Sequence, residues 1–200
     1  MNESEFLRLP PLLELIEADT KAVGFGMGSE RMAGVLLRTL AASKCGANPS
    51  AQFLELGTGT GISMAWLLDG MDAASRLTTV DNDAACVEIA LRHLSHDARV
   101  EFHVMDGSAF LASLDGKQFD LIFADTWPGK FWDLDAALAL LKPGGLYVID
   151  DLQPQPNWPE GHAPKVEALI RDLAGRQELT ICPMAWSSGL LIAVKALKSG

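Results

Sequence analysis

The sequence predicts a single α/β domain with a doubly wound, Rossmann-like mixed sheet of seven strands, an antiparallel last strand and helices on both faces. Three observations support this fold. Short apolar runs alternate with helical patterns as far as about residue 175, which is typical of parallel sheets connected by helices. A chain of 200 residues with 48% hydrophobic content can bury a full core without disulfides or a structural metal. No linker, repeat or low-complexity tract divides it, so we expect one domain over residues 1–200.

The first part of the chain, residues 1–28, is the least patterned. An apolar and acidic stretch follows Pro10 and Pro11, and glycines interrupt it further on. We expect an arm or lid that covers the site of its own chain or that of a neighbour; the second arrangement would require a homodimer. From Ser29, a favoured N-cap residue, apolar side chains recur on one helical face, and Gly46 is a stop signal, so a helix is expected between them.

Strands and helices then alternate. The strand candidates are short apolar runs at 53–56, 77–80, 100–104, 121–124 and 146–149. Helical patterns separate or follow them, near 62–69, 84–95, 107–114, 131–142 and 164–174. The last two apolar runs, 179–182 and 190–194, are joined only by residues 183–189, which is too short for a crossover helix. These two strands must therefore be antiparallel neighbours.

Charge and composition exclude several classes of partner. The formal net charge is −10, from 16 basic and 26 acidic side chains, which argues against a nucleic-acid partner because such binding depends on clustered Lys and Arg. The longest apolar run, 189–194, is far shorter than the roughly 20 residues of a membrane helix, and the acids among residues 1–5 do not suit a signal peptide. Three cysteines at unrelated spacings suit a reducing cytosol. We expect a cytoplasmic protein without a membrane partner.

A glycine-rich turn follows the first predicted strand and precedes a helix. Glycines at 57, 59 and 61 permit a sharp turn and a close approach of the backbone to a ligand. The turn lies at the carboxyl edge of the sheet, where doubly wound folds bind nucleotide-like ligands. We therefore assign Gly57, Thr58, Gly59 and Gly61 to a cofactor site.

Two acids follow the next strands at the same edge. Asp81 comes 20 residues after Gly61, where its carboxylate can accept hydrogen bonds from ribose hydroxyls. Asp106 follows the third strand, where it can accept a hydrogen bond from an adenine amino group. A helix cap, together with Ser108, is the alternative for Asp106.

The spacing of the turn distinguishes two classes of cofactor. Dinucleotide sites use G-x-G-x-x-G and direct a helix N-terminus at the pyrophosphate, whereas this turn reads Glu-x-Gly-x-Gly-x-Gly. A carboxylate at Glu55 would repel a diphosphate and favour an ammonium or sulfonium group. S-adenosylmethionine meets that demand, so Glu55 joins the expected cofactor site.

At residues 54–63 the sequence resembles class I S-adenosylmethionine-dependent methyltransferases, within them the catechol O-methyltransferase-like branch. These residues are similar to the first motif of that branch, and the resemblance extends over about residues 28–196. In the branch, the serine after the last glycine contacts the methionine carboxylate, a role that the resemblance gives to Ser63. The motif is specific for methyltransferases but not for any substrate.

Residues 119–127 and 143–151 resemble the family's fourth- and fifth-strand motifs, which hold a divalent cation such as Mg²⁺. The resemblance implies Asp125, Asp150 and Asp151 as ligands, with Asp125 also at the cofactor and in catalysis. Three carboxylates would suit such a hard cation, which could lower the pKa of a substrate hydroxyl and align it with the sulfonium methyl group. Asp151 stands where the family has asparagine.

The general base has two candidates. The resemblance implies Lys130, although the family's spacing between aspartate and lysine is stretched here and an exposed lysine is the alternative. His162 is the other candidate, in a long proline-rich loop, 154–164, over the expected substrate mouth. Trp127 and Trp158 lie in expected loops, where their rings can form the floor of a site for an aromatic substrate. Trp66 and Trp132 lie in expected helices and are expected in the core.

The combined expectation is an S-adenosylmethionine-dependent methyltransferase that acts on a small-molecule hydroxyl, phenolic or catechol-like, with the help of a divalent metal. Four alternatives stay open. A metal-independent methyltransferase could act on nitrogen or on another hydroxyl. An aminopropyl transferase would share the cofactor site, although Ser63 argues against it. A NAD-dependent oxidoreductase would need the other glycine spacing. The fourth is a protein that binds S-adenosylmethionine without catalysis.

Overall fold

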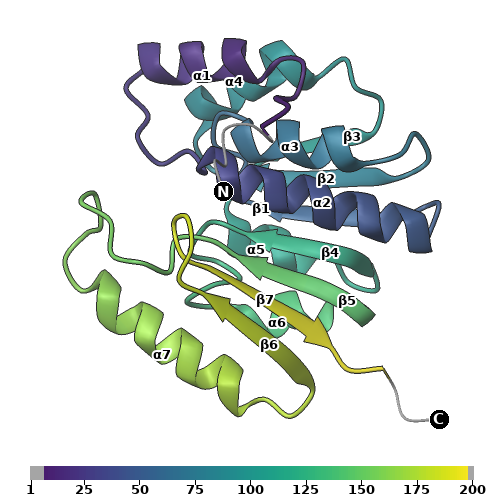
Figure 1. The fold of residues 1–200 in the computed structure, drawn as a ribbon, viewed down its shortest axis with the longest axis vertical. Helices are drawn as coiled ribbons and strands as arrows, with labels where there is room; N and C mark the ends of the chain where they lie inside the picture. The colour runs from purple at the N-terminus through teal and green to yellow at the C-terminus, as the bar shows by residue number, and fades with distance from the viewer. Residues whose placement is uncertain (1–6, 198–200) are drawn as a thin grey trace.

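The molecule is built on one seven-stranded sheet, seen here in a computed structural model that describes residues 7–197. The strand order is β3-β2-β1-β4-β5-β7-β6, and β7 is antiparallel to both of its neighbours (Figure 1). This confirms the predicted doubly wound sheet with an antiparallel last strand. The strands are β1 (Gln52–Leu56), β2 (Arg76–Asp81), β3 (Val100–Val104), β4 (Phe119–Ala124), β5 (Leu141–Ile149), β6 (Leu179–Met184) and β7 (Leu190–Lys195).

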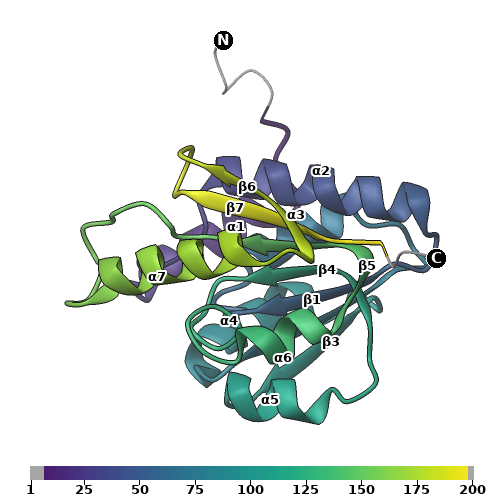
Figure 2. The ribbon, with the colours of Figure 1, turned by 90° about the horizontal axis from the view of Figure 1, so that it is seen from below.

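Helices cover both faces of the sheet. One apolar cluster joins α1, α2 and α3 to one face, and a second joins α5, α6 and α7 to the other; Figure 2 shows α2 and α3 on the opposite side of the sheet from α5 and α6. None of the helices within residues 7–197 has the length and hydropathy needed to cross a membrane. The helices are α1 (Leu13–Ala22), α2 (Arg31–Ala47), α3 (Ile62–Gly70), α4 (Ala84–Leu94), α5 (Gly107–Ser113), α6 (Leu134–Ala139) and α7 (His162–Gly175).

The central strand β1 shows how the sequence builds this core. Its successive side chains point to opposite faces, so Phe53 belongs to the first cluster and Leu54 to the second, both fully buried. On the first face Trp66 is also fully buried, as predicted, against α2 at Gly34, where any side chain would collide with the indole ring. Apolar residues on both faces of a parallel strand are what a sheet between two helical layers requires.

The boundaries of α2 differ from the prediction. The N-cap is Glu30 and not Ser29, and the helix continues through Gly46 to Ala47. The Ser29 hydroxyl is instead engaged by Asp125, to which it donates a hydrogen bond of 3.1 Å. A tertiary partner has therefore taken the side chain that local preference would use as a cap.

The helix predicted near 131–142 is much shorter in the structure. It covers only Leu134–Ala139, because Asp133 before it has a left-handed backbone (φ 56°) and β5 already begins at Leu141, where it pairs with Phe119. Trp132 consequently lies outside any helix and is 44% exposed, so its predicted place in the core is wrong.

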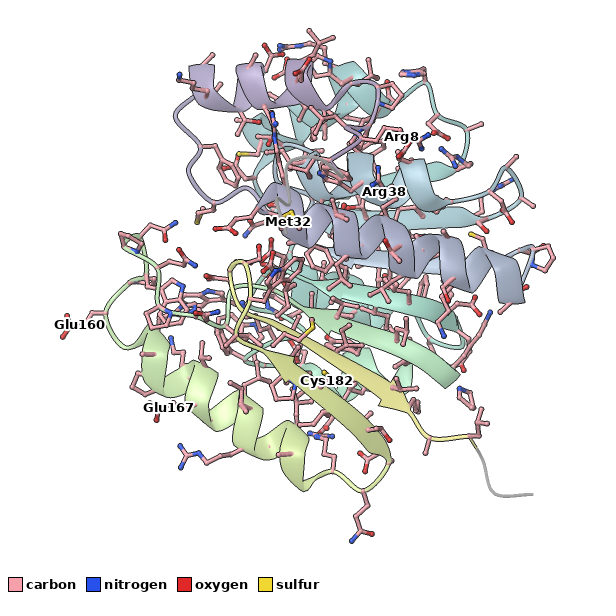
Figure 3. The ribbon with its side chains drawn as sticks, in the orientation of Figure 1. Arg8, Met32, Arg38, Glu160, Glu167 and Cys182 are labelled. Carbon is pink, nitrogen blue, oxygen red and sulfur yellow. The ribbon has the colours of Figure 1, made fainter. Side chains whose placement is uncertain are left out.

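Residues 1–28 are only partly an arm. Residues 13–22 form α1, whose Leu13 and Ile16 are fully buried in the first apolar cluster. Ahead of it, the carbonyl oxygen of Arg8 accepts a hydrogen bond of 2.5 Å from Arg38 on α2, and the two labelled side chains lie close together in Figure 3. Residues 1–6 lie outside the described part of the chain. Residues 25–30, between α1 and α2, are the part of this region that reaches the cavity described below.

Candidate cofactor and acceptor site

A cavity of about 650 Å³ opens at the carboxyl ends of the central strands. Its walls come from six parts of the chain: residues 25–30, the glycine turn with the start of α3, residues 81–83 after β2 with Cys86 of α4, residues 125–130 after β4, the connection from β5 to α7, and Ser188 between β6 and β7. Figure 1 shows the connections before α2 and before α7 at the same end of the sheet. The strand order reverses between β1 and β4, so this is the crevice where open α/β sheets bind ligands.

The glycine turn needs glycine at both ends. Gly57 has φ 104°, and a Cβ there would stand 2.8 Å from the carbonyl oxygen of Asp125 on the neighbouring strand end. Gly61 has φ 92° and caps α3, with Ala90 of α4 only 3.0 Å from where its Cβ would be. Both positions combine a left-handed backbone with close packing, so the turn places bare peptide groups along the cavity wall.

Glu55 lies beneath this turn rather than at the cavity wall. Its carboxylate is fully buried and accepts hydrogen bonds of 2.7 Å from both Ser63 and Thr79. Burial raises the pKa of Glu55 to about 7, against the effect of these two hydroxyls. The expectation that this carboxylate faces a cationic cofactor directly is therefore not met: Ser63, which does line the cavity, stands in front of it.

Asp81 is at the cavity, as expected, and Asp106 is not. Asp81 accepts hydrogen bonds from the backbone N–H groups of Gly59 (2.8 Å) and Asp83 (2.9 Å), which fix its position beside the turn. Asp106 is the N-cap of α5, exposed and bonded to the Ala109 N–H at 2.9 Å, and it is not among the residues that line the cavity. The helix-cap alternative describes Asp106 better than an adenine contact does.

The three predicted metal ligands all line the cavity, but each already accepts a hydrogen bond from another group of the protein. Asp125 accepts a hydrogen bond from Ser29; Asp150 accepts from the Ser188 hydroxyl and, at 2.7 Å, from the Asp151 N–H. Asp151 accepts from the indole N–H of Trp158 at 2.7 Å. Burial raises the pKa of Asp125 well above its usual value, with a further contribution from the charge of Asp150, and burial likewise raises the pKa of Asp150.

This donor set does not fit a divalent ion. Within residues 7–197, no group of three or more His, Cys, Asp or Glu side chains is close enough to hold a metal. A hard cation needs several oxygens that converge on one point, whereas these carboxylates turn to separate hydroxyl, backbone and indole donors. The resemblance-based expectation of a metal at Asp125, Asp150 and Asp151 is thus not supported by the geometry.

Lys130 brings a positive charge close to Asp125 and Asp150. Its side chain is 3% exposed, which contradicts the exposed alternative, and its Nζ donates to the carbonyl oxygens of Asp150 (2.6 Å) and Asp151 (3.5 Å). The charge of Lys130 lowers the pKa values of Asp125 and Asp150, against the larger effect of burial. The lysine is a fixed cation at the end of β5.

His162 begins α7 and is one of the residues that line the cavity. It is 3% exposed and packs against the rings of Trp158 and Phe131, with centroids 4.4 and 5.0 Å away. Neither ring nitrogen has a hydrogen-bond partner, although Nε2 lies 3.7 Å from Oδ2 of Asp151. Burial, with the charge of Lys130, lowers the pKa of His162 from 6.5, against the opposing effect of Asp151, so the imidazole is neutral at pH 7.

Two polar contacts next to the cavity involve residues that the sequence alone did not single out. Asn157 donates a 3.2 Å hydrogen bond to the carbonyl oxygen of Gly26, and Ser187 donates one of 2.6 Å to Glu30. Trp127 and Trp158 also line the cavity, consistent with the expected aromatic floor, while Glu160 on the same connection points away from the molecule in Figure 3. No local signal marks Asn157 or Ser187, because their partners come from distant parts of the chain.

The sequence matches known methyltransferases. Residues 54–152 match the model of a family described as a methyltransferase domain. A protein of Mycobacteroides abscessus named as an O-methyltransferase is 30% identical over 191 residues, which cover 89% of this chain and 86% of that protein. One of Mycobacterium ulcerans with the same name is 27% identical over 188 residues, or 89% and 83% of the two chains.

Solved structures show the same fold. The O-methyltransferase TomG of Streptomyces achromogenes, in complex with S-adenosylmethionine, superposes with a TM-score of 0.82 at 23% identity and covers 97% of this chain and 94% of its own. An O-methyltransferase of Bacillus cereus in complex with SAH has a TM-score of 0.79 at 19% identity, with coverage of 92% and 90%. Taken together with the glycine turn and Asp81 at the switch point of the sheet, these matches show that the chain belongs to the class I S-adenosylmethionine-dependent O-methyltransferases.

Proposed function

We propose that this enzyme methylates a hydroxyl group of a small, phenolic or catechol-like molecule and that it does so without a divalent metal. The observation that carries the proposal is a single cavity that extends from the glycine turn and Asp81 to Lys130, Trp158 and His162. Its volume of about 650 Å³ lies within the range of ordinary small-molecule sites.

The cofactor end fits S-adenosylmethionine. Gly57, Thr58 and Gly59 present backbone to the ligand, Asp81 is placed for the ribose hydroxyls, and Ser63 is the candidate contact for the methionine end. When bound, S-adenosylmethionine supplies a methyl group on a positively charged sulfur. TomG, which shares the fold, is described in complex with this cofactor.

At the acceptor end His162 is the better candidate for the general base. The Nζ atom of Lys130 donates to two backbone carbonyl oxygens, whereas the neutral His162 ring has two unpaired nitrogens. In the proposed reaction the acceptor oxygen forms a bond to the methyl carbon as the carbon–sulfur bond breaks. The electron pair of that bond goes to sulfur, and the hydroxyl proton goes to a ring nitrogen of His162.

Lys130 then has an electrostatic role. A fixed ammonium close to Asp125 and Asp150 stabilises the negative charge that develops on the acceptor oxygen, which is the task a metal ion would otherwise perform. Asp151, held by Trp158, stands next to His162, where its charge stabilises the protonated ring.

The test measures release of the demethylated cofactor with a panel of phenols, catechols and amines, after dialysis against a chelator and again with added Mg²⁺. We expect turnover of a hydroxyl acceptor at the same rate in both conditions. Loss of activity on chelation that Mg²⁺ restores would show that the metal-dependent alternative is right. Methylation of amines alone would show that the acceptor atom is nitrogen.

A further inference from the structure

Helix α1 contacts the glycine turn through a pair of buried hydroxyl groups. Thr20 of α1 is 6% exposed, and Thr60 of the turn is 2% exposed. Their Oγ1 atoms are hydrogen-bonded to each other at 2.7 Å, and the Thr20 hydroxyl also donates to the carbonyl oxygen of Ile16 at 2.6 Å. Thr60 itself lines the cavity. The hydroxyl pair therefore joins a helix near the start of the chain to the cofactor end of the cavity.

The end of α1 brings an aromatic ring onto the same turn. The helix ends in a Schellman motif: Gly24 has φ 70° and its N–H donates to Lys21, while the N–H of Phe25 donates to the carbonyl oxygen of Thr20 at 3.2 Å. A Cβ at Gly59 would lie 3.4 Å from two ring carbons of Phe25, so the ring is in van der Waals contact with the bare backbone there. Phe25 also lines the cavity. The end of α1 thus makes one polar and one apolar contact with the turn.

The turn has only two side chains by which the rest of the protein can hold it. Residues 57–61 are glycine except for Thr58 and Thr60. The Thr58 hydroxyl is hydrogen-bonded at 2.6 Å to that of Thr79 on β2, a strand inside the sheet. The Thr60 hydroxyl is paired with Thr20. One of the two side-chain anchors of the turn therefore depends on how α1 is docked.

The two halves of α1 are held in different ways. The first half is anchored by Leu13 and Ile16, which are fully buried in the first apolar cluster. In the second half, Asp19 accepts hydrogen bonds of 2.9 Å from Arg92 and His93 of α4, beside which α1 lies in Figure 1. Partly exposed ion pairs of this kind contribute little, so the second half of α1 should open more easily than the sheet. A ligand shifts such an equilibrium only if it binds the docked and the open state with different affinity.

We propose that Thr20 is a positioning residue for the cofactor: its hydroxyl holds the glycine turn in the conformation that binds S-adenosylmethionine, so that cofactor binding and docking of the second half of α1 favour each other. Thr20 is not among the residues that line the cavity, and it acts through Thr60 and Phe25, which are. The inference rests on the cofactor end of the proposed function and not on the identity of the acceptor or its base. Because the coupling is a free energy between two sites, it must act equally in both directions.

The experiment removes the Thr20 hydroxyl and measures cofactor binding. Thr20→Val keeps the shape of the side chain, and Thr20→Ser keeps the hydroxyl. We expect Thr20→Val to raise the Kd of S-adenosylhomocysteine, measured by calorimetry, about 3- to 10-fold, the effect of one neutral hydrogen bond, and Thr20→Ser to restore most of the affinity. The KM for S-adenosylmethionine should rise by a similar factor. The kcat at saturating cofactor should stay nearly unchanged, because no residue of α1 lines the cavity.

Two further variants locate the effect. Thr39 on α2 donates to the carbonyl oxygen of Val35, four residues earlier, at 2.8 Å, as Thr20 does to Ile16, but it is exposed and outside the cavity. Thr39→Val is therefore the matched control and should leave the Kd unchanged. Thr60→Val should weaken binding at least as much as Thr20→Val does. The double variant, Thr20→Val with Thr60→Val, should bind no more weakly than Thr60→Val alone, because the shared hydrogen bond is already lost.

Hydrogen exchange on the unaltered protein tests the same coupling without depending on how a variant folds. S-adenosylhomocysteine should slow exchange in residues 17–22 of α1 as well as in the glycine turn. If exchange in residues 17–22 does not change, if Thr20→Val binds like the unaltered protein, or if the two substitutions act independently in the double variant, the inference is wrong and the proposed function stands. If the unaltered protein does not bind S-adenosylhomocysteine, the cofactor end of the proposed function fails, and the inference fails with it.

Discussion

His162 is the residue whose surroundings most clearly require an explanation. A buried imidazole normally has at least one hydrogen-bond partner, yet both nitrogens of His162 lack one. The nearest carboxylate oxygen, Oδ2 of Asp151, lies 3.7 Å away, beyond hydrogen-bond distance but close enough to stabilise a protonated ring. This is the arrangement expected of a base that is oriented in the free enzyme and pairs fully only when the acceptor is bound.

The first prediction concerns this base. His162→Gln should lower kcat by about 10²- to 10⁴-fold while cofactor affinity, measured by calorimetry, changes little. In the wild type, burial and Lys130 hold the pKa of His162 below 6.5, against Asp151, while Lys165 adds a smaller lowering effect. Activity should therefore persist below pH 6.5 and fall only as the pH drops through this lowered pKa. If the activity of His162→Gln still fell at low pH as that of the wild type does, His162 would not be the general base.

The second prediction concerns Glu55, whose pKa is raised from 4.5 to about 7 by burial. The folded protein holds a proton on Glu55 that the unfolded chain loses above pH 4.5, so this residue makes folding less favourable as the pH rises from 4.5 to 7. The expected decrease in the free energy of unfolding is on the order of 3 kcal/mol.

Glu55→Gln, which cannot ionise, should remove this decrease. The measurement is chemical denaturation of both proteins at several pH values. Ser63 and Thr79 both donate to the carboxylate, so the amide must reorient one hydroxyl, and the variant should be slightly less stable at pH 4.5. Parallel stability curves for the two proteins would show that Glu55 stays ionised in the fold.

Some site residues could be predicted from the sequence and others could not. Gly57, Gly61 and Asp81 lie at fixed offsets from one strand, so a local pattern is enough to place them. The position of Glu55 depends on whether its side chain faces the cavity or the layer beneath, and Thr79 and Ser63 decide that. Ser188 reaches Asp150 across 38 residues of sequence, a distance at which no local pattern applies.

At the scale of elements, the glycine turn between β1 and α3 shapes the cofactor end of the cavity through its backbone geometry. Gly57→Ala would combine a left-handed backbone with a methyl group 2.8 Å from the carbonyl oxygen of Asp125. We expect a loss of stability of more than about 2 kcal/mol and a large loss of S-adenosylmethionine affinity. Thermal unfolding and calorimetry measure the two effects.

Gly116→Ala is the matched control for this third prediction. Gly116 also has a positive φ, 77°, but a Cβ there would meet nothing within 4 Å. Its alanine variant should carry only the backbone strain, about 1–2 kcal/mol, with cofactor affinity unchanged. Equal effects of the two substitutions would show that the close approach of Gly57 to Asp125 has no bearing on the site.

Element boundaries were harder to predict than element types. The alternation of strand and helix is correct because each apolar run is buried by its neighbours on both sides. The helix predicted near 131–142 is short because the pairing of Leu141 with Phe119 extends β5 over residues that a helical pattern also fits. Tertiary pairing of this kind overrides local preference, as it does for Ser29 at the start of α2.

At the scale of the whole molecule, two distant parts of the chain meet over the cavity. Residues 25–30 come from the connection before α2, and residues 151–161 from the connection before α7; both connections contribute residues to the cavity wall. Few polar contacts hold the mouth: Asn157 to Gly26 at 3.2 Å, Ser187 to Glu30 at 2.6 Å and Ser29 to Asp125 at 3.1 Å. The sheet beneath is a continuous ladder between two apolar layers, so these connections should open far more easily than the core.

The fourth prediction follows from this contrast in stability. A ligand that fills the cavity contacts both connections at once, so S-adenosylhomocysteine should slow hydrogen exchange in residues 25–30 and 151–161 as well as in the glycine turn, with little change in β6. At 100 times its dissociation constant the ligand should also stabilise the fold by about 2.7 kcal/mol, whereas NAD should do neither. Protection confined to the glycine turn would mean that the mouth does not close over the cofactor, and the closure would then have to come from the acceptor.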